Sequence, residues 1–262
     1  MHVLTRLRYA AFALVVAWTA VACAQAQRAP ANSAYQPEVA QAGKDVVWVP
    51  TPQAVVDRML DMAKVTPQDF LMDLGSGDGR TVITAAKRGT RAVGIEYNPD
   101  MVELSKANAR AAGVTERAQS MKADLFETDF SKATVITMFL LPGINLKLRP
   151  KILGLKPGTR VVSNTFTMGE WQPDDKQTVD AGCDGSWCTA LLWIVPARVA
   201  GSYKVPQGDL TLKQEFQMVS GTLNSNGRTV PVQGKINGDE LTLSTGSREY
   251  HGKVNGKQLD LH

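Results

Sequence analysis

Three glycines at alternate positions form the most informative stretch of the chain, DLGSGDGR at residues 73–80. Glycine tolerates a positive φ angle and lets a ligand approach the backbone closely, so this turn indicates a nucleotide site, although glycines also serve tight turns. A dinucleotide fingerprint G-x-G-x-x-G starting at Gly75 would require glycine at position 80, where this chain has Arg80. The turn therefore indicates a nucleotide without specifying NAD. Its candidate ligand-binding residues are Asp73, Gly75, Ser76, Gly77 and Gly79.

Two further acidic residues follow at the ends of apolar stretches. Glu96 comes about 20 residues after the turn, where a carboxylate can accept hydrogen bonds from both hydroxyls of a ribose. Asp124 ends a third stretch and is followed by Leu125. Alone, Glu96 could be a solvated strand end and Asp124 a loop cap, but in this order behind the glycine turn they predict one ligand site.

Short apolar stretches alternate with helical patterns through the middle of the chain. The predicted strands are 69–74, 91–96, 118–123, 133–140, 159–166 and 188–197, and the predicted helices among them are 80–88, 99–113 and 144–153. A further helix is expected before the turn, with Thr51 as N-cap and Pro52 at its first position. The alternation predicts an α/β fold with a doubly wound, mostly parallel sheet, in which ligands bind outside the carboxyl ends of the strands.

After residue 198 the pattern changes to the alternation of half-buried strands. GKINGDELTL (234–243) and GKVNGKQLDL (252–261) repeat each other, and each carries an Asn-Gly dipeptide suited to a type I′ hairpin turn. SNGRTVPV, beginning at Ser225, is a looser third copy. Residues 198–262 are therefore expected to form a small antiparallel β module, a meander that packs on the preceding domain or on a partner.

The D-x-G-x-G-x-G spacing, in this context, resembles the first motif of the class I S-adenosylmethionine-dependent methyltransferases. The resemblance implies a Rossmann-like domain over residues 45–197 that binds S-adenosyl-L-methionine. It also implies that Glu96 binds the ribose hydroxyls, that Asp124 reads the adenine amino group, and that a backbone amide in the segment beginning at Leu125 contacts the adenine ring.

Longer stretches are similar to the small protein-lysine methyltransferases related to the mitochondrial ATP synthase c-subunit lysine methyltransferase. They are VVWVPTPQAVVDRML, LGSGDGRTVITAAKRG, AVGIEYNPDMVELS, DLFETDFSKATVITMFLLPGINLKL and GTRVVSNTF. The similarity implies methyl transfer to a protein lysine, with residues from Trp48 to Thr51 folding over the methionine end of the cofactor. A small-molecule methyltransferase and a non-catalytic binding protein with the same fold are the alternatives.

One motif departs from a pattern found in many methyltransferases that act on amino groups and DNA. Those enzymes carry Asn or Asp, two prolines and an aromatic residue after the fourth strand, whereas this chain has Phe139-Leu140-Leu141-Pro142. Methylation of adenine N6 or of glutamine is therefore disfavoured. Phe139 and Leu141 could contact an acceptor or simply belong to the core.

The acceptor site should exclude water and hold a nucleophile in line with the S–CH3 bond of the cofactor. Burial beside aromatic rings would also lower the pKa of a lysine amine and favour its neutral, nucleophilic form. Candidates for this aromatic wall are Trp48, Phe139, Phe166 and Trp171, each with a place in the core as its alternative. No general base is assigned.

The N-terminus and the cysteines indicate in which cell compartment the protein is expected. Residues 1–26 have the charged start, apolar centre and small-residue end of a signal peptide, and residues 27–44 resemble a linker. An uncleaved membrane anchor and lipidation of Cys23 are the alternatives. Export to the periplasm would favour a disulfide between Cys183 and Cys188, since a metal site needs more ligands than two cysteines and no histidine lies nearby.

The net charge of +4 comes without a long run of basic residues, so a nucleic-acid partner is not expected. The expected partner is a protein of the envelope or membrane, with a small-molecule acceptor as the alternative. Export raises a question of supply, because S-adenosylmethionine is made inside the cell and a charged molecule does not cross a bilayer unaided.

Overall fold

The computed structural model describes residues 35–246, 248–256 and 258–262. The predicted signal peptide, Cys23 and the first part of the predicted linker lie outside the described residues. Within the described part of the chain, no helix combines the length and the apolar character needed to cross a membrane.

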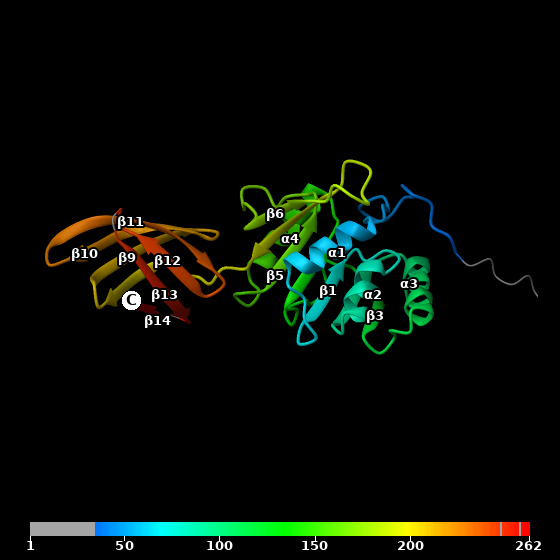
Figure 1. Cartoon of the computed structure of the whole chain (residues 1–262), viewed down its shortest axis with the longest axis horizontal. Coiled ribbons are helices and arrows are strands. Elements are labelled where there is room, and N and C mark those ends of the chain that lie inside the picture. Colours follow the sequence, from blue (N-terminus) through cyan, green and yellow to red (C-terminus); the bar gives the residue numbers. More distant parts are fainter. Residues whose placement is uncertain (1–34, 247, 257) are drawn as a thin grey trace, which may run out of the picture. The chain divides into compact units, whose positions relative to one another are not determined.

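The first sheet, of which Figure 1 labels β1, β3, β5 and β6, has seven strands in the order β3-β2-β1-β4-β5-β7-β6. Its first five strands in that order run parallel, and β7 runs antiparallel between β5 and β6. The predicted doubly wound, mostly parallel sheet is confirmed, and the strand order reverses between β1 and β4, where such sheets bind ligands. The bounds are β1 Phe70–Leu74, β2 Arg91–Glu96, β3 Ala118–Lys122, β4 Val135–Met138, β5 Arg160–Asn164, β6 Asp175–Thr178 and β7 Thr189–Ile194.

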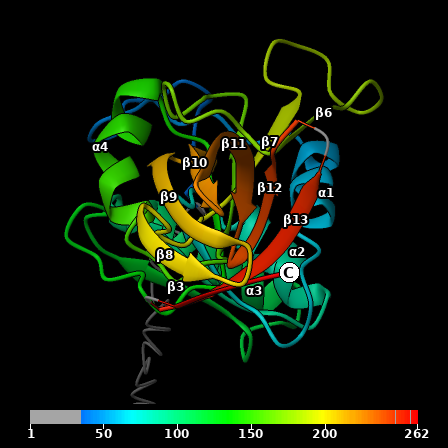
Figure 2. The same ribbon diagram turned by 90° about the vertical axis from the view of Figure 1, so that its left-hand side faces the viewer.

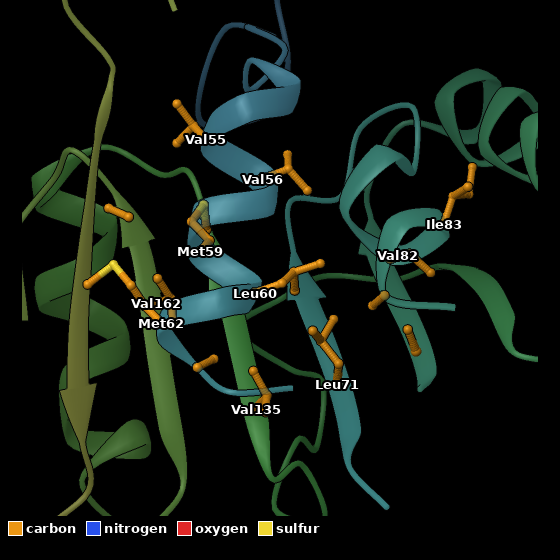
Figure 3. Close-up of a cluster of buried hydrophobic side chains, with 14 of the residues drawn as sticks. Val55, Val56, Met59, Leu60, Met62, Leu71, Val82, Ile83, Val135 and Val162 are labelled. Carbon is orange, nitrogen blue, oxygen red and sulfur yellow. The ribbon is translucent and has the colours of Figure 1, made fainter. Parts of the chain in front are cut away.

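Helices cover both faces of this sheet. They are α1 Gln53–Met62, α2 Arg80–Lys87, α3 Pro99–Ala111 and α4 Pro142–Ile152. Met59 and Leu60 of α1 belong to one apolar cluster with Leu71 and Val135 of the strands, and Val55 joins the same cluster from the start of the helix (Figure 3). On the opposite face, α4 contributes Ile144, Leu148 and Ile152 to a second apolar cluster. Successive strand residues point to opposite faces, which divides Leu71 and Met72 between the two clusters.

Two helix starts differ from the prediction. Pro52, not Thr51, is the N-cap of α1, and no side chain in the described part of the chain caps this helix. Helix α4 begins at Pro142, two residues before the predicted Ile144, because proline suits the first turn of a helix, where no N–H bond is required. The short polar strand β6 was not predicted, since its residues are mostly exposed and, among the described strands, it pairs only with β7.

The second sheet contains β8 to β14 in sequence order, all antiparallel neighbours (Figure 2). It forms a nearly closed barrel in which Gln207 Nε2, in the β8–β9 turn, donates to the carbonyl of Leu261 in β14 at 3.3 Å. Apolar side chains including Leu212, Ile236 and Leu243 fill its interior. The bounds are β8 Gly201–Val205, β9 Gly208–Glu215, β10 Met218–Ser225, β11 Arg228–Asn237, β12 Glu240–Ser244, β13 Glu249–Asn255 and β14 Gln258–Leu261.

The repeated Asn-Gly dipeptides lie at hairpins, but their turns are displaced by one residue. Asn237 pairs with Glu240, so the two central residues are Gly238 and Asp239, and only the glycine has a positive φ, +61°. Glycine at the first central position suits a type II′ turn rather than the predicted type I′. In the looser copy, Asn226 and Gly227 do occupy the centre, both with positive φ.

The β module contacts the α/β domain through a few side chains. Phe216 stacks on Trp171 with ring centroids 6.0 Å apart, and Lys235 Nζ lies 2.7 Å from the buried carboxylate of Asp174. Trp171 is fully buried in the core. The prediction that it could belong to the aromatic wall of the acceptor site is therefore wrong, and its alternative, a place in the core, is confirmed.

Candidate functional site

The glycine turn connects β1 to α2 at the carboxyl edge of the sheet. Gly75, Gly77 and Gly79 have φ angles of +75°, +54° and +82°, a region that other residues rarely adopt. A Cβ atom on Gly77 would lie 2.6 Å from Nε1 of Trp48, and one on Gly79 would lie 2.0 Å from Oγ of Ser105. The turn therefore needs glycine both for its conformation and for the close approach of neighbouring side chains.

Glu96 is fixed at the end of β2 by two backbone donors. The N–H of Gly77 donates to Oε2 and the N–H of Asn98 donates to Oε1, both at 2.9 Å. These bonds hold the carboxylate between the glycine turn and the start of α3. A carboxylate has about four acceptor sites, so this one retains acceptor capacity for a ligand.

Asp124 follows β3 and is paired with Lys44 from the predicted linker. The N–H of Phe126 donates to its Oδ1 at 2.9 Å. The hydrogen bond from Lys44, together with that from Phe126, holds the pKa of Asp124 below its usual range, so the carboxylate stays ionised. Lys44 Nζ also lies 4.6 Å from the ring centroid of Tyr97, which places a cation against both an aromatic face and an acid.

Asp73 lies in β1, buried beneath the turn. Thr137 Oγ1 donates to its Oδ1 at 2.6 Å. Burial raises the pKa of Asp73 from 3.8 to about 6, against the lowering effect of the Thr137 and Ser76 hydroxyls, and the nearby Asp78 and Glu96 charges raise it further. The neighbouring Ser76 hydroxyl is buried beside this carboxylate and also lines the pocket.

A pocket lies over this edge of the sheet, beneath the segment 41–51. The segment is ordered by backbone bonds between Ala40 and Trp48 and between Trp48 and Gln41. Arg80 Nη1 donates to the carbonyl of Thr51 at 2.9 Å, which ties the segment to the start of α2. Residues of the predicted linker thus take part in the cover of the pocket.

The structure brings nine of the ten predicted cofactor-binding residues to this pocket. They are Trp48, Thr51, Asp73, Gly75, Ser76, Gly77, Glu96, Asp124 and Leu125. Gly79 does not line it and instead forms the N-cap of α2. Sequence reasoning missed Lys44 and Tyr97, although an aromatic residue directly after the acid at the end of β2 was a usable signal.

Aromatic side chains gather at the other end of the pocket, beyond β4. Phe139, which lines the pocket, stacks on Phe166 with ring centroids 5.8 Å apart. Its ring also meets that of Trp187 edge to face at 6.0 Å. Trp187 was not among the predicted wall residues. It lies between Cys183 and Cys188, which form the predicted disulfide.

The site fits S-adenosylmethionine on its own geometry. Glu96 retains acceptor capacity for a ligand, Asp73 and Ser76 line the pocket, and the turn admits no side chain at Gly77, where a Cβ would meet Trp48. Carboxylates at the ends of β2 and β3 suit a nucleoside with ribose hydroxyls and an amino group.

Comparison with known proteins agrees with this assignment. The profile of a family described as the ANTKMT methyltransferase domain matches residues 73–175. A protein-lysine N-methyltransferase of Saccharolobus islandicus is 49% identical over 140 residues, which are 52% of this chain and 87% of that protein. The lysine N-methyltransferase of the ATP synthase c-subunit from Mus musculus is 40% identical over 118 residues, 45% of this chain and 47% of that protein, so this chain spans about half of the mouse enzyme.

A solved structure gives the same fold with a different acceptor in its name. It is an RNA methyltransferase from Salinibacter ruber in complex with S-adenosyl-L-homocysteine, 48% identical, with a TM-score of 0.54, covering 58% of this chain and 96% of that chain. The strand order, the glycine turn and these relatives lead to one conclusion. The chain belongs to the class I S-adenosylmethionine-dependent methyltransferases, in the group related to the lysine methyltransferases of the ATP synthase c-subunit and of the adenine nucleotide translocase.

Proposed function

We propose that this methyltransferase transfers the methyl group of S-adenosylmethionine to the ε-amine of a protein lysine. The observation that carries the proposal is that the acidic end of one pocket leads, across the switch point of the sheet, to aromatic rings at Phe139. The first end suits a nucleoside, and the second suits the alkyl stem and amine of a lysine.

The cofactor residues take separate roles in this proposal. Glu96 binds the ribose hydroxyls, and Asp124 with the backbone near Leu125 binds adenine once Lys44 leaves the carboxylate. The glycine turn and Ser76, with Trp48 and Thr51 above them, hold the methionine part. The ionised form of Asp73 attracts its positively charged amino group.

The bound cofactor supplies an activated methyl group, and the chain supplies position and surroundings. The aromatic rings around Phe139 exclude water and align the lysine stem. Low polarity around the amine lowers its pKa, which raises the fraction of neutral nucleophile. Because burial already favours the neutral amine, the proposal assigns no side chain as general base.

The acceptor is inferred to be protein rather than RNA. The two relatives near half identity are named for different acceptors, so identity alone does not decide. The Phe139-Leu140-Leu141-Pro142 stretch lacks the polar and paired-proline motif found in many enzymes that methylate base amino groups. The exposed apolar side chains Leu141 and Trp187 near Phe139 suit a protein surface better than a phosphate backbone.

We further propose that the acceptor is an envelope or membrane protein and that the enzyme is exported. The predicted signal peptide and the disulfide between Cys183 and Cys188 support this location, because disulfides persist in oxidising compartments. The cofactor must then be supplied to the envelope, or an uncleaved N-terminus must keep the enzyme facing inward.

The test is to incubate purified protein and radiolabelled S-adenosylmethionine with an envelope extract of the source cells, with and without ribonuclease. Label should appear in a protein band, resist ribonuclease and be recovered as methyllysine after acid hydrolysis. The Gly77→Arg variant should not label the band. Gly113→Arg is the matched control, because Gly113 also has a positive φ, +68°, but a Cβ there would meet nothing within 4 Å.

Each other outcome contradicts a specific part of the proposal. Label lost to ribonuclease would assign an RNA acceptor, and label in a small metabolite alone would assign a small-molecule enzyme. Binding of S-adenosylhomocysteine without any transfer would favour the non-catalytic alternative.

A further inference from the structure

We propose that Trp187, held in place by the Cys183–Cys188 disulfide, forms the outer wall of the lysine site and sets the affinity for the methyl acceptor. The inference rests on the proposed function and adds a specificity-determining residue to it.

Trp187 is connected to the pocket through one aromatic residue. Phe139 lines the pocket, and its ring meets Trp187 edge to face at a centroid distance of 6.0 Å. Yet Trp187 is 42% exposed, which leaves much of the indole open to solvent. Trp187 therefore contacts the pocket residue with one edge and presents the rest of its indole to an incoming side chain.

The disulfide ties the tryptophan loop to the core. Cys188 is buried, and its carbonyl accepts a hydrogen bond from the N–H of Val179 at 2.8 Å. The next residue, Thr189, begins β7, and its carbonyl accepts from the N–H of Thr165 at 2.6 Å. Cys183 packs against the apolar cluster that includes α1, so both ends of the span from Cys183 to Cys188 are fixed. With its ends fixed, this short span restricts the positions open to Trp187.

The inner wall is held by separate bonds. Ser163 Oγ donates to the carbonyl of Phe166 at 2.8 Å, and Asn145 Nδ2 donates to the same carbonyl at 3.2 Å. Phe166 stacks on Phe139 at 5.8 Å. Phe166 and Trp187 therefore flank Phe139, the ring of the three that lines the pocket.

This arrangement suits the chemistry of a lysine acceptor. Aromatic faces attract ammonium and methylammonium groups and pack against the alkyl stem. Trp187 acts on the acceptor and not on the cofactor, because it does not line the cofactor pocket. Its loss should change acceptor affinity while leaving cofactor affinity intact.

The experiment uses the protein band that the full-length enzyme labels in envelope extract, purified as the acceptor. Trp187→Ala should raise the acceptor concentration for half-maximal rate about tenfold, with little change in the maximal rate. Trp187→Phe should recover most of the loss. The double variant Cys183→Ser/Cys188→Ser should give an intermediate increase of about threefold. S-adenosylhomocysteine affinity, measured by calorimetry, should stay unchanged in all of them.

A second readout needs no activity. The difference in acrylamide quenching of tryptophan fluorescence between wild type and Trp187→Phe reports Trp187, and this difference should grow when dithiothreitol reduces the disulfide. Met218→Ala is the control and should show the wild-type quenching before and after reduction, because Met218 is an exposed apolar residue of β10 in the β module.

Three results would overturn the inference. If Trp187→Ala leaves the acceptor concentration for half-maximal rate unchanged, Trp187 is not part of the acceptor site. If reduction does not change the quenching of Trp187, the disulfide does not hold Trp187 in place. Failure of the wild-type enzyme to label any protein would overturn the proposed function together with this inference. This outcome differs from the first two, because in those the wild-type enzyme still labels its acceptor.

Discussion

The two ends of the site are built from opposite kinds of side chain. At the ends of β2 and β3, the carboxylates of Glu96 and Asp124 are fixed by backbone N–H groups. At the ends of β4 and β5, the rings of Phe139 and Phe166 stack, and Trp187 joins them from a loop. One end offers directed hydrogen-bond acceptors and the other offers apolar surface.

The difference reflects what each end must recognise. A nucleoside cofactor is small, polar and always the same, so fixed charges can match its hydroxyl and amino groups. A lysine acceptor arrives on a larger molecule, loses its charge before it reacts and must leave water behind. Changes at the acidic end should therefore alter cofactor affinity, and changes at the aromatic end should alter acceptor use.

The largest effect is expected from Gly77→Arg. The site of the missing Cβ lies 2.6 Å from Trp48 Nε1, and the φ of +54° disfavours any side chain, so arginine would displace the cover and fill the methionine region. Binding of S-adenosylhomocysteine should fall more than about 100-fold in calorimetry. Gly113→Arg should bind normally, and equal losses in both variants would mean that backbone strain alone explains the effect.

Glu96→Gln should weaken the cofactor about 10- to 30-fold, because charge-assisted hydrogen bonds to the ribose become neutral ones. Acceptor dependence at saturating cofactor should not change. Glu103→Gln provides the control, since Glu103 is exposed on α3 and pairs only with Lys106 among the described residues. Unaltered cofactor affinity in Glu96→Gln would show that the ribose is bound elsewhere.

The third effect depends on pH. Asp73 has a pKa of about 6 in the folded protein, so its carboxylate is ionised at pH 7 and mostly protonated at pH 5. The protonated form no longer attracts the amino group of the cofactor, and affinity for S-adenosylhomocysteine should fall up to about tenfold from pH 7 to pH 5. Asp124 is ionised across this range in the free protein, because the hydrogen bonds from Lys44 and from the N–H of Phe126 lower its pKa. Asp73→Asn should abolish the pH dependence, and its persistence in that variant would assign it to another group.

The smallest effect concerns Lys44, which pairs with Asp124 where adenine is proposed to bind. Lys44→Met should remove this competition and tighten cofactor binding about threefold, since exposed ion pairs contribute little. Titration calorimetry at low and high salt would measure it, and the gain should shrink as salt screens the pair. Weaker binding in Lys44→Met would instead assign Lys44 a direct contact with the cofactor.

The sequence predicted the acidic end better than the aromatic end, for a physical reason. The glycine turn, Glu96 and Asp124 lie at strand ends, so strand order alone brings them together. Trp187 lies in a polar loop with no periodic pattern, and only the disulfide and β7 bring it to Phe139. Trp171, an expected wall residue, stacks on Phe216 of the β module in the core, a contact between residues distant in sequence.

The same reasoning applies to the fold. The parallel strands and the hairpins at the Asn-Gly dipeptides follow local patterns and were predicted within a few residues. Barrel closure depends on the contact between the β8–β9 turn and β14 through Gln207 and Leu261, which no local pattern indicates. Strand β6 escaped prediction because its exposed polar residues resemble a loop.

The most direct test of this division of the site is a crystal structure of the full chain with S-adenosylhomocysteine bound. We expect adenine against Asp124 with Lys44 displaced, the ribose on Glu96, and the sulfur directed toward Phe139 and the opening beside Trp187. A sulfur atom directed away from Phe139, or an adenine bound elsewhere while the Lys44–Asp124 pair persists, would contradict the division into an acidic cofactor end and an aromatic acceptor end.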